Sequence, residues 1–337
     1  MSSHIAINGR FQQRRITGVD RYAHEISKRL TMPNYFITPS YSLGRVTGHL
    51  WEQLFLPARI RTRDLLWSPA NTGPWTVQNQ IITIHDASVF DHPEWFDPTF
   101  ALWTRLSWKV LAKRAKAIFT VSNFSRERLK FHLEIPEEKI HVIHNGVGKP
   151  FEPQPQKSIE RVKEKYGIKK PYFLFVGTKE PRKNLAGLAQ AWKLLGTRSH
   201  SLFIAGAEGN VFANQTHHEV LLNQTYVPDE DLPALYSGAT SVINPSVYEG
   251  FGLTILEAMA CGAPVIAADI SVFREIFDGT VLFFNPYYPN ELASTIQKVT
   301  EDKSCTNVLI EKSLAHASRF SWDESARRTQ TILESLA

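Results

Sequence analysis

The chain has 337 residues, more than one compact core usually holds, so its length predicts two domains. Its 43% hydrophobic and 21% charged residues are ordinary for a globular protein, and two cysteines, Cys261 and Cys305, without CxxC or zinc spacing, exclude a disulfide framework and a structural zinc site. The net charge of +5 is compatible with phosphorylated ligands or anionic surfaces, but the sequence has neither the basic stripe nor the module of a nucleic-acid-binding protein.

The first half of the sequence alternates short β-rich runs with helical patterns. Strands are predicted over residues 4–8, 34–38, 65–68, 80–85, 117–122 and 139–145. Helical patterns occupy residues 19–30 and 123–131 between them. The N-terminal stretch lacks the apolar core of a signal peptide, and no run approaches the roughly 20 apolar residues that span a bilayer. We therefore expect a cytoplasmic protein.

Residues 99–119 form a basic amphipathic pattern with Trp103, Leu106 and Val110 on one helical face. Tryptophans beside lysines suit a membrane surface. They equally suit a helix that packs on the sheet with solvated lysines, and we favour this second interpretation. The aromatic stretch WEQLFLPARIRTR (51–63) is another candidate for an acceptor or membrane face.

The alternation breaks at residues 147–170, where Pro150, Pro153 and Pro155 disfavour both helix and paired strand, so this segment begins as a linker. Alternation then restarts. Strands are predicted over residues 171–177, 200–206, 239–245, 263–269 and 280–286, and helices over residues 184–195, near PDEDLPALYSG (228–238) and after EGFG (249–252).

Repeated strand–helix alternation predicts an α/β fold with parallel sheets covered on both faces. Two similar halves predict two Rossmann-like domains facing a cleft, where ligands preferentially bind. We place the first domain at residues 1–150, the linker and the start of the next domain at 151–170, and the second domain at 171–321.

The stretch NPSVYEGFGLTILEAMACG holds two acids, Glu249 and Glu257, around a turn bracketed by Gly250 and Gly252. A strand–glycine turn–helix unit directs backbone N–H groups and the positive end of the helix dipole at one point, which makes an anion site. Carboxylates repel phosphate but accept hydrogen bonds from hydroxyl groups. The pattern indicates a ligand with sugars flanking a diphosphate, although a solvated loop acid and an acid at a helix start explain it equally well.

A second strand–turn–helix unit, GTKEPRKNL (177–185), places Arg182 and Lys183 at the start of a helix. Cations there oppose the helix dipole, so a bound anion is an economical explanation; the alternative is a solvated basic turn. Both units follow strands of the same predicted domain. We therefore expect one phosphate site assembled from the two.

Two other patterns are ambiguous. His85 ends a predicted strand before Asp86, and a lone histidine there is more often structural than catalytic. Asp229 and Asp231 form a DxD string, which can bind a metal but here is typical of an acid-rich helix start. We predict no metal site.

EGFG with a second acid eight residues after the first, preceded by GT-x-x-PRKN, resembles family 4 of the retaining glycosyltransferases, which have the GT-B architecture. The likeness is greatest to bacterial mannosyltransferase-type members that build polysaccharides. It implies that the last helix, residues 322–337, returns to the first domain. The likeness extends over TGVDRYAHEI (17–26), WEQLFLP (51–57), HDASVFDHPEWF (85–96), TVSNFSRERL (120–129), HNGV (144–147), YVPDEDLPALYSGA (226–239) and FSWDESA (320–326).

The resemblance implies roles for the charged positions. Arg182 and Lys183 would contact the donor diphosphate, Glu257 would hold the ribose, and Glu249 would hold hydroxyl groups of the transferred sugar. Many relatives carry arginine where this chain has Thr178, so neutralisation of the diphosphate would depend more heavily on the two cations.

The resemblance also assigns uncharged positions. Gly18 would let the first domain approach the diphosphate, Val227 would lie near the base, and His85 would lie beside the sugar and the reaction centre. With Gly250 completing the turn, sugar and phosphate would meet the backbone amides of Phe251, Gly252 and Leu253.

The predicted function is that of a retaining glycosyltransferase that moves a hexosyl unit, mannosyl from GDP-mannose, to a glycan or lipid-linked glycan acceptor in polysaccharide biosynthesis. The nucleotide-diphosphate sugar is a substrate, and no cofactor is expected. A UDP-sugar donor and a non-catalytic nucleotide-sugar-binding subunit are the alternatives. We also expect peripheral contact with an anionic membrane at its inner face. A dinucleotide oxidoreductase is excluded because NGRFQQ lacks GxGxxG.

Overall fold

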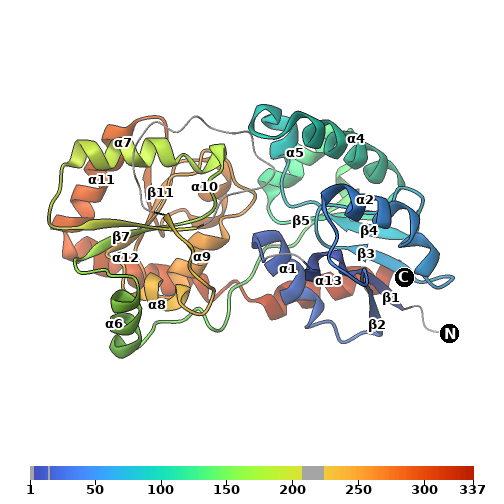
Figure 1. Ribbon diagram of the computed structural model, residues 1–337, viewed down its shortest axis with the longest axis horizontal. Coiled ribbons are helices and arrows are strands. Elements are labelled where there is room, and N and C mark those ends of the chain that lie inside the picture. Colours follow the sequence, from blue (N-terminus) through green and yellow to red (C-terminus); the bar gives the residue numbers. More distant parts are fainter. Residues whose placement is uncertain (1–3, 14–15, 207–223) are drawn as a thin grey trace. The chain divides into compact units, whose positions relative to one another are not determined.

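The computed structural model describes residues 4–13, 16–206 and 224–337 (Figure 1). The chain divides into two compact units, each built on its own sheet. The N-terminal unit comprises Met1–Pro93, Pro98–Gly146 and Ser321–Ala337, and the C-terminal unit comprises Glu94–Asp97 and Val147–Phe320.

The sheet of the N-terminal unit has six parallel strands in the order β2-β1-β3-β4-β5-β6. Every residue of β1, β3, β4 and β5 is buried, as expected for a parallel sheet covered on both faces. The strands are β1 (Ile5–Asn8), β2 (Asn34–Ile37), β3 (Leu65–Ser68), β4 (Gln80–Thr83), β5 (Ala117–Thr120) and β6 (Ile140–Val142).

Helices cover this sheet. α1 begins at a capping box in which Thr17 and Asp20 bind each other's backbone amides. The α-helices are α1 (Gly18–Ser27), α2 (Arg45–Leu54), α3 (Ser88–Asp91), α4 (Pro98–Arg114), α5 (Asn123–Leu133) and α13 (Trp322–Leu336). Short 3-10 turns are η1 (Gly9–Gln13), η2 (Pro57–Arg59), η3 (Pro93–Trp95) and η4 (Glu137–Lys139).

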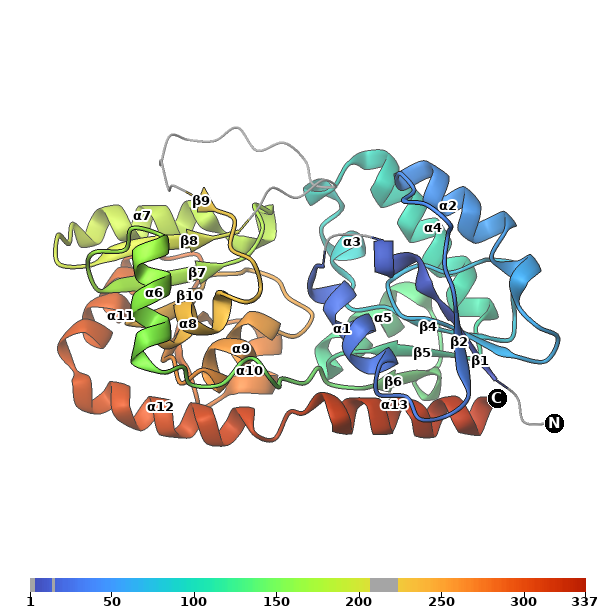
Figure 2. The ribbon, with the colours of Figure 1, turned by 60° about the horizontal axis from the view of Figure 1, so that its bottom comes forward.

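The C-terminal helix α13 belongs to the N-terminal unit, where it packs beside α1 (Figure 2). A Cβ added at Gly146 would lie 2.2 Å from the amide nitrogen of Trp322, so only glycine allows this approach. Ser325 Oγ donates to the carbonyl of His144 at 2.6 Å. The segments HNGV and FSWDESA, far apart in the sequence, therefore meet in one unit.

The sheet of the C-terminal unit is also six-stranded and parallel, in the order β12-β11-β10-β7-β8-β9. Its strands are β7 (Tyr172–Val176), β8 (Ser201–Ala205), β9 (Gln224–Thr225), β10 (Ser241–Asn244), β11 (Val265–Ala268) and β12 (Leu282–Phe284). Numbered within this unit, the order from β9 to β12 is 3-2-1-4-5-6, the Rossmann order, and the strand order reverses between β7 and β10.

The core of this unit is an apolar cluster between its sheet and its helices, with Phe173, Phe175, Leu188 and Ile243 all at most 1% exposed. The helices are α6 (Gln156–Lys165), η5 (Pro181–Lys183), α7 (Leu185–Leu195), α8 (Leu232–Ser237), α9 (Leu253–Ala260), α10 (Ser271–Phe277), α11 (Pro289–Glu301) and α12 (Lys303–Ala317).

The α/β class with parallel sheets is confirmed, and the predicted strands appear, residues 65–68 with the predicted bounds and the others in shorter form. α2, α3, α10, α11, α12 and β9 were not predicted. α6 lies inside residues 151–170, assigned from the sequence to a linker and the start of the second domain; it begins directly after Pro155 and packs against α8.

The buried face of α4 differs from the predicted one. Trp108 and Leu111 are buried, whereas Leu106 is 52% exposed and Trp103 stacks on Trp75 with ring centroids 4.9 Å apart. The helical pattern placed Trp103, Leu106 and Val110 on one face of the helix. The opposite face carries small residues, which allow α4 to approach its unit more closely, so this opposite face is the buried one. α4 thus packs on its unit with its lysines solvated.

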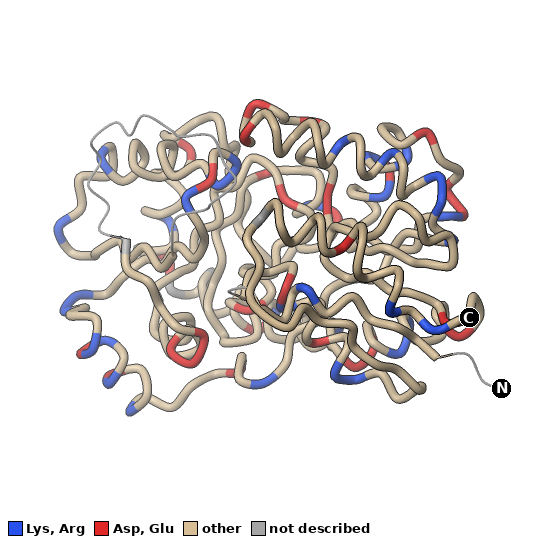
Figure 3. Tube along the Cα trace, turned by 45° about the vertical axis from the view of Figure 1, so that its right-hand side comes forward, with Lys and Arg blue, Asp and Glu red and all other residues tan. Residues whose placement is uncertain are grey.

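The described helices include none that is both long and apolar enough to cross a bilayer. Basic and acidic residues are interspersed along both units (Figure 3). The net charge of +5 therefore does not come from one basic block.

Candidate active site

The two segments that the sequence indicates as an anion site come together in the C-terminal unit. β7 and β10 are neighbours, and the loop after each carries one segment: Arg182 and Lys183 after β7, and Glu249 after β10. Carboxyl ends of adjacent parallel strands meet at one edge of a sheet, and ligands of open α/β sheets bind where the strand order reverses. The three residues lie at that point.

Arg182, Lys183 and Glu249 form a buried ion triad. Arg182 Nη1 donates to Glu249 Oε2 at 2.6 Å, and Lys183 Nζ donates to Glu249 Oε1 at 2.5 Å. Their side chains are only 18%, 11% and 9% exposed. The Val247 amide donates to the Arg182 carbonyl at 2.8 Å and so ties the two loops together.

Further side chains hold this triad. Ser246 Oγ donates to Glu249 Oε1 at 3.0 Å, and Arg182 Nε donates to Glu180 Oε2 at 2.5 Å. Glu180 also accepts from the hydroxyl of Thr178. Two cations thus face two carboxylates, and these four charges sum to zero.

Burial raises the pKa of Glu249, but the charges of Arg182 and Lys183 outweigh burial and lower the pKa to about 2. The carboxylate is therefore ionised at neutral pH. Removing one member of a buried ion cluster leaves the others uncompensated, which is costly. An incoming anion that replaces Glu249 as their partner keeps the two cations compensated.

The glycine turn beside the triad requires its glycine. Gly252 is the N-cap of α9 with φ 102°, and an added Cβ would lie 2.7 Å from the Phe273 ring. Gly250 and Phe251 are buried, and Leu253 is the first residue of α9. The first amides of an α-helix lack intrahelical acceptors, so this turn is suited to receive an anion.

Glu257 lies one turn inside α9 and is 3% exposed. The hydroxyl of Tyr236, a fully buried side chain of α8, donates to Glu257 Oε2 at 3.2 Å. Tyr236 thereby fixes the orientation of the acid that the resemblance assigns to the ribose. This tyrosine was not predicted as a site residue, and its place within YVPDEDLPALYSGA is the signal that the sequence offers for it.

Val227 is buried in the segment between β9 and α8, and its predicted place beside the base stays a prediction. The DxD string that follows it serves the fold. Asp231 Oδ2 accepts from Lys165 Nζ at 2.5 Å and from the Tyr166 hydroxyl at 2.7 Å, which ties α8 to α6.

The structure places His85 at the carboxyl end of β4 in the N-terminal unit, 6% exposed. Its Nε2 lies 3.1 Å from the Pro69 carbonyl; because a carbonyl only accepts, Nε2 carries the proton and Nδ1 is an acceptor. Burial lowers the pKa of His85, so the ring is neutral. The carboxylate of Asp86, the next residue, accepts from the amide and the hydroxyl of Ser88.

Gly18 is the exposed first residue of α1, in the same unit. A Cβ added there would meet nothing within 4 Å. The fold of the unit therefore does not require glycine at this position. The close approach of a ligand is the remaining explanation for this glycine. The helix that Gly18 begins also contacts His85, through the Tyr22 ring at a centroid distance of 4.7 Å.

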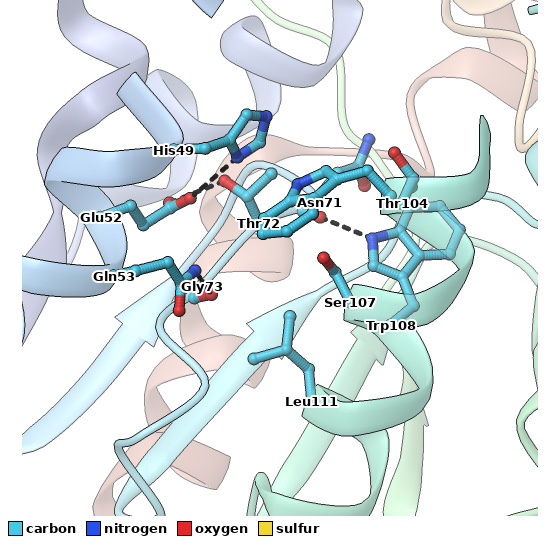
Figure 4. Close-up of a pocket in the computed structure, with 11 residues that line it drawn as sticks. His49, Glu52, Gln53, Asn71, Thr72, Gly73, Thr104, Ser107, Trp108 and Leu111 are labelled. Atoms are coloured by element: carbon cyan, nitrogen blue, oxygen red, sulfur yellow. Dashed lines mark hydrogen bonds and ion pairs between the residues drawn. The ribbon is translucent and has the colours of Figure 1, made fainter. Parts of the chain in front are cut away.

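A second polar cluster lies where the strand order of the N-terminal sheet reverses, at β1 and β3. Glu52 of α2 is fully buried and accepts from Asn8 Nδ2 at 2.6 Å, Thr72 Oγ1 at 2.7 Å and Arg10 Nη1 at 3.1 Å. With His49 it lines a small cavity between α2 and α4 (Figure 4).

Hydrogen bonds connect the residues that line this cavity to His85. Trp108 Nε1 donates to the Asn71 carbonyl at 2.7 Å, and the His85 amide donates to Asn71 Oδ1 at 2.9 Å. This cluster was not predicted: Glu52 lies in WEQLFLP, but nothing near it in the sequence indicates the burial of its charge.

Two family models match the chain: the one described as Glycosyltransferase Family 4 over residues 60–148, and the one described as Glycosyl transferases group 1 over residues 157–316. The chain is 32% identical to the O-antigen chain mannosyltransferase B of Escherichia coli, over 77% of this chain and 70% of that protein. It is 29% identical to the O-antigen chain mannosyltransferase RfbU of Salmonella typhimurium, over 74% and 69% of the two chains.

Among solved structures, Anabaena Alr3699/HepE in complex with UDP and glucose superposes with a TM-score of 0.75. It covers 99% of this chain and 100% of its own, at 17% sequence identity, so it shows the fold alone. The GT-B fold is thereby confirmed. The chain belongs to glycosyltransferase family 4 and is a glycosyltransferase.

Proposed function

We propose that the protein transfers a mannosyl unit from GDP-mannose to a hydroxyl group of a growing glycan, with retention of configuration at the anomeric carbon. The observation that carries this proposal is the buried triad of Arg182, Lys183 and Glu249 beside the amino terminus of α9. Mannose is supported by two relatives that are both O-antigen chain mannosyltransferases.

In this proposal the donor diphosphate takes the place of Glu249. The diphosphate accepts hydrogen bonds from Arg182 and Lys183, and the amides at the start of α9 bind it as well. Glu249, released from both cations, then accepts hydrogen bonds from hydroxyl groups of the sugar. Glu257, oriented by Tyr236, accepts from the ribose hydroxyls.

During transfer the bond between the anomeric carbon and the diphosphate oxygen breaks, and a bond to the acceptor oxygen forms on the same face. The acceptor proton passes to the departing phosphate oxygen. Arg182, Lys183 and the helix amides stabilise the negative charge that develops there. Neutral His85, with Nδ1 as its acceptor, orients a hydroxyl of the sugar near the reacting carbon.

We propose that this chemistry needs no metal or other cofactor. Two cationic side chains and the helix amides supply the positive groups that a diphosphate requires. Asp231 is already engaged by Lys165 and Tyr166, so the DxD string is occupied by contacts that hold α6 and α8 together. Transfer should continue undiminished in the presence of EDTA.

We further propose that the acceptor is a glycan or lipid-linked glycan and that the protein is cytoplasmic, with peripheral contact at the inner face of an anionic membrane. The O-antigen relatives support a polysaccharide product. A UDP-sugar is the second candidate donor, because the Anabaena structure of the same fold contains UDP and glucose.

A panel of GDP- and UDP-sugars tests the proposal. We expect GDP release from GDP-mannose in the presence of a mannose-terminated acceptor, and an α-anomeric product by NMR. Lys183→Ala should abolish most of this release, whereas Asp269→Asn, in an exposed ion pair of the same unit, should not. Release from UDP-sugars alone would overturn the donor, and binding of nucleotide sugars without any transfer would favour a non-catalytic subunit.

A further inference from the structure

A cavity of about 360 Å³ lies in the N-terminal unit at β6, the last strand of its sheet. α5 packs against β6 on one side, and Figure 2 shows α13 beside the same strand. The volume falls within the range of about 300–1,000 Å³ that is typical of small-molecule sites. We call this space the β6 cavity. Its lining includes Asn123 and Arg126 of α5, His141 of β6, His144 of the following loop, and Arg328 and Ile332 of α13.

The ionisable side chains that line the β6 cavity are all bases. Two are arginines and two are histidines, and none of the described residues in its lining is Asp or Glu. Guanidinium groups bind phosphate through two parallel N–H bonds, and imidazole N–H groups can donate to the same oxygens. Such a lining is suited to an anion with several acceptor oxygens.

Arg328 brings a positive charge that no carboxylate contacts within the described part of the chain. Its Nη2 donates to the Val142 carbonyl at 3.1 Å, which holds the guanidinium beside β6. Glu324, one turn earlier on α13, pairs with Arg327 instead, at 2.7 Å. Covering a carbonyl of an edge strand explains one N–H group of Arg328, whereas a guanidinium has five. The other N–H groups are available to a ligand.

Arg126 lines the same cavity from the first turn of α5. Its contacts with acids are long for ion pairs, since Nε lies 3.3 Å from Glu127 Oε1 and Nη2 lies 3.4 Å from Glu137 Oε1. Glu137 has a closer partner in Lys130, at 2.7 Å. A bound anion can therefore recruit Arg126 while Glu137 keeps its counter-ion. Because α5 begins at Asn123, the positive end of its dipole adds to the field in the cavity.

The β6 cavity is larger than a phosphate group requires. Ile140 and Ile332 give it apolar walls, and the carboxamide of Asn123 can exchange hydrogen bonds with hydroxyl groups. These features match a compact hydroxylated molecule attached to the phosphate. An extended polyanion fits poorly, because Glu127, Glu137 and Glu324 flank the two arginines and their side chains are about half exposed, at 53%, 45% and 49%.

We propose that the β6 cavity binds a small phosphorylated metabolite of about hexose size. Arg126 and Arg328 hold the phosphate, and His141 and His144 supply further donors. The proposed donor site lies in the C-terminal unit and shares no residue with this cavity. The inference therefore goes beyond the proposed function and does not depend on it.

Calorimetric titration of the full chain with mannose 6-phosphate, in a buffer without phosphate or sulfate, tests the site. The wild type should bind, and Arg328→Gln should bind roughly ten- to a hundredfold more weakly because it loses a charge-assisted contact. The matched control is Arg327→Gln, which removes the same charge from the next position of α13, outside the cavity, and should bind like the wild type. Lys183→Ala, at the proposed donor site, should also leave this binding unchanged.

The site would be overturned if the wild type did not bind or if Arg328→Gln bound equally well. It would also be overturned if Arg327→Gln lost as much affinity, which would indicate non-specific attraction of anions, or if Lys183→Ala abolished binding, which would place the phosphate at the donor site. Arg126→Gln removes a side chain whose ion-pair partners are exposed, and it should weaken binding by a similar factor even if Arg328→Gln fails to fold.

Two further ligands test the chemical class. Inorganic phosphate and unphosphorylated mannose should each bind more weakly than mannose 6-phosphate, because each lacks part of the matching group. Tighter binding of inorganic phosphate would refute the assignment to a phosphorylated metabolite. Absence of transfer from GDP-mannose in a protein that binds mannose 6-phosphate normally would refute the proposed function and leave the β6 cavity standing.

Discussion

Glu249→Gln removes the carboxylate that neutralises Arg182 and Lys183 while it preserves side-chain size. The pKa of Glu249 is lowered from 4.5 to about 2, and each pKa unit corresponds to about 1.4 kcal/mol. The side chain is 9% exposed, so solvent screening reduces this little. We therefore expect the free energy of unfolding of the C-terminal unit to fall by about 3 kcal/mol at neutral pH.

The same change should strengthen nucleotide binding. A diphosphate would no longer displace an internal carboxylate, and a charge-assisted hydrogen bond contributes about 1.5–3 kcal/mol, so GDP affinity should rise roughly ten- to a hundredfold. The kcat should fall at least about tenfold, because the sugar hydroxyls lose a charged acceptor. Calorimetric GDP titration, urea unfolding with and without GDP, and transfer kinetics measure these three effects.

The pH dependence of unfolding follows from the same pKa. Because the folded pKa of Glu249 lies below its unfolded value, its stabilisation is present above pH 4.5 and is lost as the pH falls toward about 2. Glu249→Gln should lack this part of the acid response. Asp269→Asn is the control: its ion pair with Arg274 is 42% and 47% exposed, so it should cost less than about 1 kcal/mol. If the Glu249→Gln variant unfolds and binds GDP like the wild type, Glu249 is not the internal counter-ion of Arg182 and Lys183.

Lys183→Ala should weaken donor and GDP binding together, by about ten- to a hundredfold, because both ligands carry the diphosphate; unchanged GDP binding at low salt would remove Lys183 from the site. Gly18→Ala should leave thermal stability unchanged or slightly raised, since an added Cβ meets nothing, while the donor KM rises; a wild-type KM would contradict the assigned close approach. Tyr236→Phe loses its hydrogen bond to Glu257 and should raise the KM for donor and the Kd for GDP about fivefold with kcat nearly constant; a fall in kcat alone would argue against this positioning role.

Local sequence was sufficient to predict most secondary structure. Residues 65–68 and 171–177 are apolar runs bounded by polar or turn-forming residues. The first run forms β3 and the second contains β7, and both strands are largely buried in parallel sheets. The glycine turn at Gly252 was also predictable, because a strand, a glycine and an apolar helix follow one another directly. Such features depend on neighbours along the chain, which the sequence displays.

The ion triad was only half predictable. Arg182 and Glu249 could each be identified as site residues, but 67 positions separate them in the sequence. Their contact depends on β7 and β10 becoming neighbours in the sheet, a pairing that no local pattern specifies. The sequence therefore indicated a cation for a phosphate and an acid for hydroxyl groups, whereas the tertiary structure binds the two to each other.

α2 shows the same division between what the local sequence indicates and what the tertiary structure decides. WEQLFLP stands out in the sequence as aromatic and apolar, yet the partners that bury Glu52 come from η1 and from the loop after β3. Once those partners hold the inner face, Leu50 and Leu54 can only face solvent. By itself the sequence determined the residue types and the helical spacing. Which face is buried was decided by tertiary structure, because the burial of a charge depends on the groups that distant segments bring within hydrogen-bonding distance.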